Sequence, residues 1–131
     1  MYADEKMKSM PHAQLVYKFA KLISDKDYES ASRMLTPSLR TEYNAEKIKK
    51  AYINMIHYIP EGEPQEPNYD PPANNSLNVE TTLEEWGSKP SNGVGWAYCS
   101  ICNDGFSEAV AVTVEKHGDN YLIGSIEWGR P

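Results

Sequence analysis

Hydrophobic positions at the start of the chain recur at helical spacing. Ser9 is placed to cap a helix and Pro11 is tolerated in its first turn. The residues from Ser24 to Asp27 interrupt the pattern, so we expect the helix to end there and a second helix to be capped. The apolar positions of the first helix follow offsets of four, seven and eight residues: Leu15, Phe19, Leu22 and Ile23.

Two further helices are predicted before residue 57. The second helix ends before Thr36-Pro37, a helical turn is expected around 38–42, and Asn44 is the expected cap of the third helix. The second helix buries Tyr28, Ala31, Met34 and Leu35. The third helix has an apolar stripe of Ile48, Ala51, Tyr52, Met55 and Ile56, with Lys47, Lys49 and Lys50 pointing away.

The period changes to two after residue 76, which predicts strands. Leu77, Val79, Thr81 and Leu83 alternate with polar residues in a strand that ends near Trp86. Three more strands are predicted at Val94–Cys102, Phe106–Glu115 and Tyr121–Trp128, joined by turns at Asn103–Gly105 and His117–Asn120. Helices followed by hairpin-linked strands predict an α+β fold, with the helices packed on one face of an antiparallel sheet.

The two faces of the third strand differ in the size of their side chains. Phe106, Glu108, Val110, Val112 and Val114 share one face, and Ala109, Ala111 and Thr113 share the other. Branched side chains fill space against helices, whereas small ones permit another layer or a second subunit to approach closely. The sequence does not decide whether a homodimer forms through the sheet.

Charge divides the chain into halves of opposite sign. Residues 1–56 hold ten Lys or Arg and seven Asp or Glu, a net charge of +3. Residues 57–131 hold three and twelve, a net charge of −9, so the whole chain carries −6. A concentrated negative field favours a basic partner or a cation and repels nucleic acid. We therefore expect a basic protein partner and no nucleic acid.

Length and composition favour one globular domain over residues 1–131, with 40% apolar and 24% charged residues. Its expected parts are a helical half (1–56), a proline-rich acidic segment (57–76) and a sheet (77–131). No apolar run approaches the roughly 18 residues of a membrane span. The charged N-terminal residues also lack the apolar core of a signal peptide. We therefore expect no membrane partner and a cytoplasmic location.

The order of these elements resembles a known family. A helix, then the segment Asp25–Pro37, then a further helix and a curved antiparallel sheet look like the nuclear-transport-factor-two-like superfamily. The ending, residues 125–131, is similar to that of small bacterial proteins with this fold. The resemblance implies a cystatin-like cone, as in ketosteroid isomerase and polyketide cyclases, and some relatives are immunity proteins against polymorphic toxins. Because this superfamily includes enzymes, binding proteins and transport factors, the resemblance does not choose a function.

Carboxylates and aromatic side chains gather in the acidic segment and near the end of the first strand. Five prolines keep the segment 57–76 extended, which reduces the entropy lost on docking. Aromatic side chains bordered by carboxylates resemble interface anchors for a Lys- or Arg-rich partner. The alternative is a solvated acidic loop with its aromatic side chains packed on the domain. The predicted partner-binding residues are Glu61, Glu63, Glu66, Tyr69, Asp70, Glu84, Glu85 and Trp86.

The cysteines and histidines predict neither a metal site nor a cofactor. Cys99 and Cys102 form a CxxC motif, but on a strand their Cα atoms lie about 10 Å apart on opposite faces. A disulfide tolerates at most about 7 Å, and a structural zinc site needs about four ligands. His12, His57 and His117 share no metal-ligand spacing and are expected on the surface. We expect two separate structural thiols.

Glu108 is the residue with the most catalytic potential, because it lies on the valine-bearing face of its strand. A carboxylate enclosed by the domain serves as a general acid or base. In ketosteroid isomerase relatives a tyrosine donor assists such an acid, and the resemblance implies Tyr17, Tyr52 or Tyr98 for that role. Its position near the start of the strand predicts that it reaches water instead, so no catalytic residue is assigned.

Two functions from different classes follow. The first is a non-catalytic binding protein, an immunity-type inhibitor that occludes the basic surface of a toxin such as a nuclease. The second is a small-molecule binder or an isomerase- or cyclase-like enzyme, which needs a cavity lined by Tyr17, Phe19, Tyr52, Val110 and Val112. The scarcity of inward-facing acids and histidines on the predicted strands favours the first.

Overall fold

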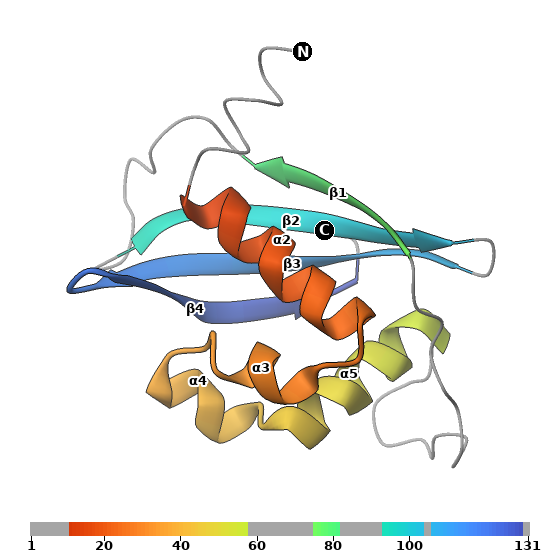
Figure 1. The fold of residues 1–131 in the computed structure, drawn as a ribbon, viewed down its shortest axis with the longest axis horizontal. Coiled ribbons are helices and arrows are strands. Elements are labelled where there is room, and N and C mark those ends of the chain that lie inside the picture. Colours follow the sequence, from red (N-terminus) through yellow and green to blue (C-terminus); the bar gives the residue numbers. More distant parts are fainter. Residues whose placement is uncertain (1–10, 58–74, 82–92, 104–105, 130–131) are drawn as a thin grey trace.

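The part of the chain that the structure describes forms two layers, with four helices packed on one face of a curved four-stranded sheet (Figure 1). The computed structural model describes residues 11–57, 75–81, 93–103 and 106–129. The helices are α2 (Pro11–Ser24), α3 (Tyr28–Ser32), α4 (Pro37–Glu42) and α5 (Ala45–His57). The strands are β1 (Ser76–Thr81), β2 (Gly93–Asn103), β3 (Phe106–His117) and β4 (Asn120–Trp128), antiparallel and in the spatial order β1-β2-β3-β4. The predicted α+β fold class is confirmed.

Helix α2 lies across the sheet, mainly over β1 and β2. It ends where the sequence predicts: Lys26 has a φ of 66°, and the backbone N–H of Asp27 bonds to the carbonyl of Leu22 at 2.8 Å. The Asp27 carboxylate then accepts a hydrogen bond from the Ser30 N–H at 3.2 Å and caps α3. The buried side of α2 includes Val16, Phe19, Ala20 and Ile23.

Helix α3 is shorter than predicted, because the chain after it pairs with the sheet instead. Leu35 forms a parallel bridge with Ile123 of β4. The Thr36 N–H donates to the Ile123 carbonyl, and the Ile123 N–H donates to the Met34 carbonyl, each at 2.9 Å. Arg40 of α4 donates to the carbonyls of Ser32, Arg33 and Leu35 at 3.0–3.2 Å. These bonds satisfy carbonyls that a longer helix would have paired internally.

Helix α5 follows the predicted pattern. The Asn44 side chain accepts a hydrogen bond from the Lys47 N–H at 2.9 Å, so Asn44 caps the helix as expected. Ile48 and Tyr52 are fully buried, whereas Lys47, Lys49 and Lys50 are exposed. The stripe therefore packs α5 against α2 and α3 and against β3 and β4.

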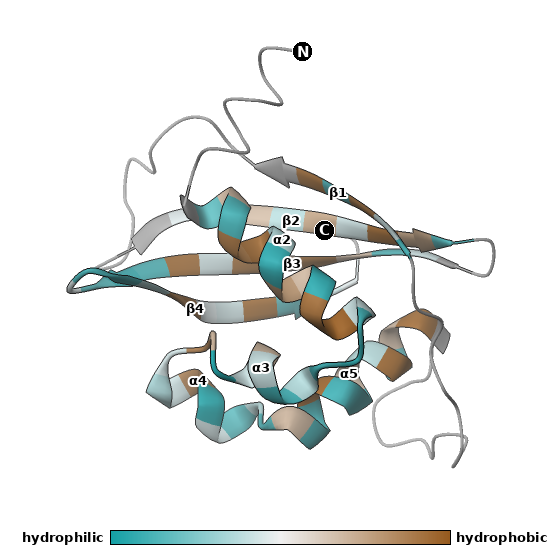
Figure 2. Ribbon diagram, in the orientation of Figure 1, coloured by the Kyte–Doolittle hydropathy of each residue, from teal (hydrophilic) through white to brown (hydrophobic). Residues whose placement is uncertain are grey.

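The strands place alternate residues on two faces, which we call the helix face and the open face. Along β2 and β3, Ala97 pairs with Val112 and Cys99 with Val110 on the helix face. Tyr98 pairs with Ala111 on the open face. Figure 2 shows the corresponding alternation of hydrophobic and hydrophilic residues along the strands. The faces predicted for the third strand are confirmed.

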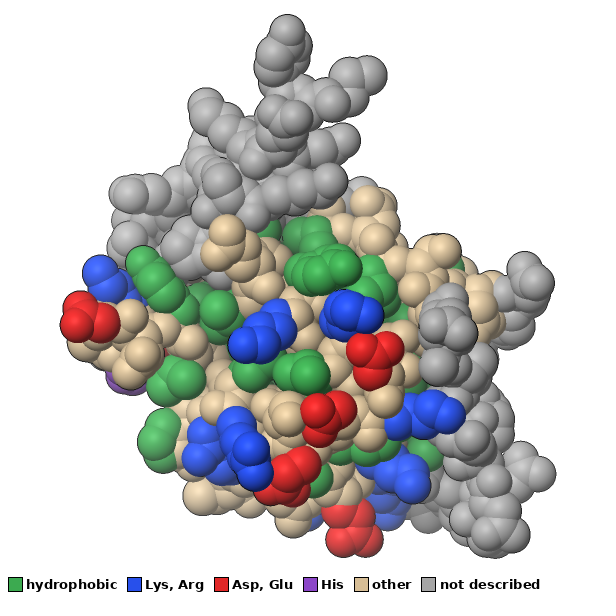
Figure 3. All heavy atoms as spheres, viewed as in Figure 1, with side chains coloured by type: hydrophobic (Ala, Val, Ile, Leu, Met, Phe, Trp, Pro, Cys, Tyr) green, Lys and Arg blue, Asp and Glu red, His purple; other side chains and the backbone are tan. Residues whose placement is uncertain are grey.

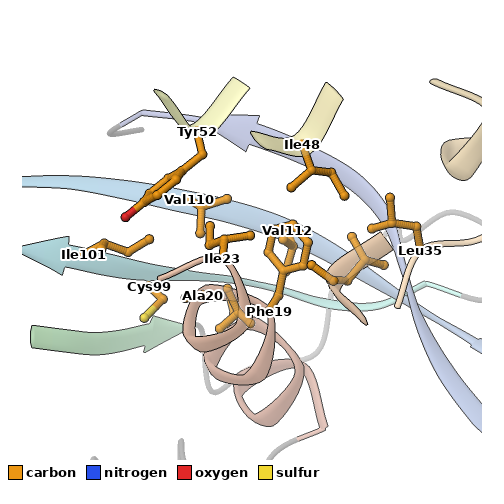
Figure 4. Close-up of a cluster of buried hydrophobic side chains, with 14 of the residues drawn as sticks. Phe19, Ala20, Ile23, Leu35, Ile48, Tyr52, Cys99, Ile101, Val110 and Val112 are labelled. Atoms are coloured by element: carbon orange, nitrogen blue, oxygen red, sulfur yellow. The ribbon is translucent and has the colours of Figure 1, made fainter. Parts of the chain in front are cut away.

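The core lies between the helix face and the helices (Figure 4). Phe19 and Ile23 of α2 contribute to one cluster with Tyr52 of α5 and the strand residues. The ring of Trp128, at the end of β4, lies 6.2 Å between centroids from both Phe19 and Tyr43. The largest fully buried side chains of the described residues are Tyr52, Phe19, Ile23, Leu35, Ile48, Ile101, Ile123, Val16, Val110, Val112 and Val114.

Candidate functional site

All eight predicted partner-binding residues lie outside the described residues. These are Glu61, Glu63, Glu66, Tyr69, Asp70, Glu84, Glu85 and Trp86. The expected continuation of the first strand beyond Thr81 and the Asp104-Gly105 part of the predicted hairpin loop also lie outside. These assignments stay predictions. Candidate sites within the described residues are the interior and the open face of the sheet.

The residues expected around an internal cavity form the core instead. Phe19, Tyr52 and Val110 are fully buried and Val112 is 1% exposed, all within one packed cluster. Tyr17 was expected on the same lining and is 45% exposed on the outer side of α2, so that expectation is wrong. Its neighbours Val16 and Phe19 take the inward positions, because the buried face of α2 is set by contact with β1 and β2.

Polar side chains gather at one end of the interior, where α2 ends and β1 begins. The Asn75 Nδ2 donates to Ser24 Oγ at 2.7 Å and lies 3.5 Å from the Tyr52 hydroxyl. The Asn103 Nδ2 donates to the Asn75 Oδ1 at 2.7 Å. In Figure 4 the Tyr52 ring extends from α5 toward the Ile101 end of β2. Hydrogen bonds of Asn75, the residue before β1, thus connect α2, α5 and β2 at this end, and sequence analysis missed this cluster.

Glu108 lies at the same end of the helix face, because its register partner Ile101 is also paired with Leu77 of β1. It is only 6% exposed, so the expectation that its side chain reaches water is wrong. The reason is that Glu108 pairs with the fully buried Ile101 on the helix face, where α2 and α5 pack on the strands. A carboxylate buried at this end of the helix face is a candidate for acid–base chemistry.

The histidines occupy different environments. His12 was expected on the surface, but it is 7% exposed and its ring packs against Gly95. A Cβ at residue 95 would lie 3.1 Å from the ring atoms, so glycine permits this close approach. His117 is exposed as expected, with Nε2 at 2.8 Å from the Glu115 carboxylate. The side chain of His57, the last residue of α5, lies outside the description.

The two cysteines are separate thiols, as predicted. Cys99 is buried on the helix face, and burial raises its pKa to about 12, opposed by a backbone hydrogen bond with Asn78. Cys102 is partly exposed on the opposite face, with Sγ at 3.2 Å from Ser107 Oγ. A thiol with so high a pKa is a poor nucleophile and a poor metal ligand near neutral pH.

The open face combines a small-residue centre with aromatic and acidic side chains. Ala109 and Ala111 are buried there at 2% and 1% exposure. Trp96 and Tyr98 lie beside them on β2, half-buried, with ring centroids 5.4 Å apart and planes tilted by 58°. Glu127 of β4 is exposed on the far side of Ala111, its register partner. The open face thus offers aromatic rings of the kind that are enriched in protein interfaces, with a carboxylate in the same row.

Charges on the helical half are interspersed. Lys21 lies 3.3 Å from Asp25, and Arg33 lies 3.8 Å from Glu29, both as exposed pairs four residues apart. Figure 3 shows Lys and Arg alternating with Asp and Glu over the helices. These pairs join opposite charges within the helical half, and residues 1–56 keep a net charge of +3. The described side chains from residue 95 onward include four carboxylates (Glu108, Glu115, Asp119 and Glu127) and one lysine (Lys116).

Comparison of the chain with known protein families, with curated proteins and with solved structures finds no match. Among the described helices, none has the length and apolar character needed to cross a membrane. The described His, Cys, Asp and Glu side chains also form no group of three that would hold a metal ion. Charge, burial and the open face are therefore the features from which function is inferred.

Proposed function

We propose that this protein is a non-catalytic binding protein that occludes a basic protein partner, as an immunity protein does with a toxin. The observation that carries the proposal is the net charge of −9 on residues 57–131, against +3 on residues 1–56. The exposed ion pairs of α2 and α3 join charges within the helical half, as in Lys21–Asp25 and Arg33–Glu29. A basic partner would supply the positive charge that complements the acidic half.

The physical mechanism is steering followed by occlusion. A concentrated negative field accelerates encounter with a positive cleft, and salt screens that field over about 10 Å at 0.1 M. Aromatic anchors buried at the contact slow dissociation. A nuclease is one toxin class with such a cleft, since its substrate is a polyanion.

The test begins with identification of proteins captured from the source lysate at about 50 mM and about 500 mM salt. Association with the purified partner should then slow at least about tenfold across that range. Replacing Glu61, Glu63, Glu66 and Asp70 together with Gln should slow association while leaving thermal unfolding unchanged. Glu42→Gln with Glu46→Gln in the helical half is the control. A salt-independent association rate would show the electrostatic proposal to be wrong.

The alternative is a small-molecule binder or an isomerase- or cyclase-like enzyme, and one observation favours it. Glu108 is buried on the helix face, at the end of the interior that holds Tyr52 and Asn75. Its test is a thermal-shift screen of small ketones and phenols with the native chain and with Glu108→Gln. A ligand that stabilises the native chain but not the variant would support this function. A ligand effect equal in both would count against a role for Glu108.

A further inference from the structure

The open face carries an aromatic pair that is suited to hold a cation. We propose that Trp96, Tyr98 and Glu127 form a recognition site for a lysine or arginine side chain of the partner. This inference rests on the proposed function and deepens it, because it assigns contact residues within the described sheet. The contacts predicted from the sequence are different residues, within 61–70 and 84–86, and these are outside the described residues.

The aromatic pair supplies the first element of the site. The centroids of the Trp96 and Tyr98 rings lie 5.4 Å apart, and their planes are tilted by 58°. Both side chains are half-buried, so packing restrains the rings while part of each surface stays accessible. A Lys or Arg head group within about 6 Å of such a ring is attracted by its quadrupole, and Trp and Tyr attract it more than Phe does.

The carboxylate supplies the second element. Ala111 pairs with Tyr98 on one side and with Glu127 on the other, so the ring and the carboxylate share one row across three strands. Two strand spacings separate their Cα atoms by about 10 Å. Glu127 is exposed, and Ala111 between them is small and buried. A long cationic side chain can lay its apolar stem against the rings and direct its charge toward Glu127.

The negative charge of the open face favours a cationic partner over a second copy of this chain. Glu115 and Glu127 both belong to the open face, and the Glu115 carboxylate lies over Gly124 of β4. A two-fold dimer through this face would bring the same acidic surface toward itself. Like charges placed opposite each other destabilise such a contact. Charge complementarity therefore assigns this face to a partner rich in Lys or Arg.

The test is a titration of the full chain, followed by ¹H–¹⁵N NMR, with a short oligo-arginine peptide as the probe. The largest shifts are expected at the Trp96 indole N–H and at the amides of Tyr98, Ala111 and Glu127. Tyr98→Leu should weaken binding about threefold, whereas Tyr98→Phe should retain most of it, because cation–π attraction requires a ring. Glu127→Gln should weaken binding about two- to fivefold. Glu46→Gln, an exposed acid of α5, is the matched control.

The outcomes separate this inference from the proposed function. Shifts confined to residues 57–74 and 82–92 would overturn the inference and leave the proposed function standing. Equal affinity of Tyr98→Leu and the native chain would also overturn the inference, since the ring would then contribute nothing. Sedimentation as a dimer that Tyr98→Glu dissociates would overturn it too, by assigning the open face to a second copy. Failure of the native chain to bind any cationic peptide at low salt would contradict both proposals.

Discussion

The helix face and the open face of the sheet are built by the same strands but have different chemistry. On the helix face, Cys99, Ile101, Val110 and Val112 are buried in the core. On the open face, the neighbouring positions hold half-buried rings, hydroxyl groups, exposed Glu127 and the two buried alanines. Because successive side chains point to opposite faces of a strand, the same strands supply both the core residues and the residues of the open face. The hydrophobic core therefore lies on the helix face.

The contrast between the faces is sharpest at neighbouring residues of β2. Ile101→Ala on the helix face should lower the free energy of unfolding by about 2–5 kcal/mol, because it leaves a cavity in the core. Ser100→Ala on the open face loses one hydrogen bond, to the Asn78 carbonyl at 3.2 Å, and should cost about 1 kcal/mol or less. Urea unfolding of both variants measures the difference. Equal costs would break the distinction between the faces.

The two thiols test the same distinction by reactivity. Cys99 should react with iodoacetamide at least about tenfold more slowly than Cys102, since the thiolate is the reactive form and burial raises the Cys99 pKa to about 12. Mass spectrometry of the native chain and of Cys102→Ser gives both rates. Rapid labelling of Cys99 in the folded variant would contradict its burial.

The raised pKa of Cys99 also predicts a pH dependence. In the unfolded chain the thiol has its ordinary pKa of 9.0, whereas the folded chain retains the proton up to about pH 12. Its contribution to stability is therefore fully present below about pH 9 and is lost as the pH rises toward 12. Cys99→Ala should remove this part of the alkaline decline in the free energy of unfolding, measured by urea unfolding across that pH range. An identical decline in the variant would contradict the raised pKa.

Glycine positions on two strands should tolerate a methyl group differently. Gly95→Ala should cost about 1–2 kcal/mol, because the new Cβ meets the buried His12 ring at 3.1 Å. A double-mutant cycle with His12→Ala, followed by urea unfolding, isolates that contact. If the losses of unfolding free energy in the two single variants add in the double variant, the His12 ring does not restrict the side chain at residue 95.

The smallest effect is expected at Gly124. There a Cβ would collide with the Glu115 carboxylate, which can swing aside at the cost of its 2.8 Å contact with His117. Since such a surface pair contributes about 0–1 kcal/mol, Gly124→Ala should change the free energy of unfolding by less than about 1 kcal/mol. In a His117→Ala background, Gly124→Ala should leave the free energy of unfolding unchanged, because the contact between Glu115 and His117 is already absent. A larger loss of unfolding free energy for Gly124→Ala than for Gly95→Ala would contradict this prediction.

Local patterns predicted most of the fold but not the polar end of the interior. The caps at Asp27 and Asn44 were predictable because each bonds to an amide three residues ahead. The cluster of Ser24, Asn75 and Asn103 was not, because its bonds join residues 51 and 28 positions apart. The burial of Glu108 follows from the same long-range packing. The eight predicted partner contacts lie outside the described residues and stay predictions.

Local periodicity predicts the order of helices and strands, the two faces of β3 and the separation of Cys99 from Cys102. These follow from periods of 3.6 and 2 residues, which act over a few neighbours. Long-range packing, in contrast, places the His12 ring against Gly95, leaves Tyr17 exposed on α2 and pairs Leu35 with Ile123. Each of these depends on how distant elements meet. Residues that meet only through contact between distant segments have no local sequence pattern that predicts the contact.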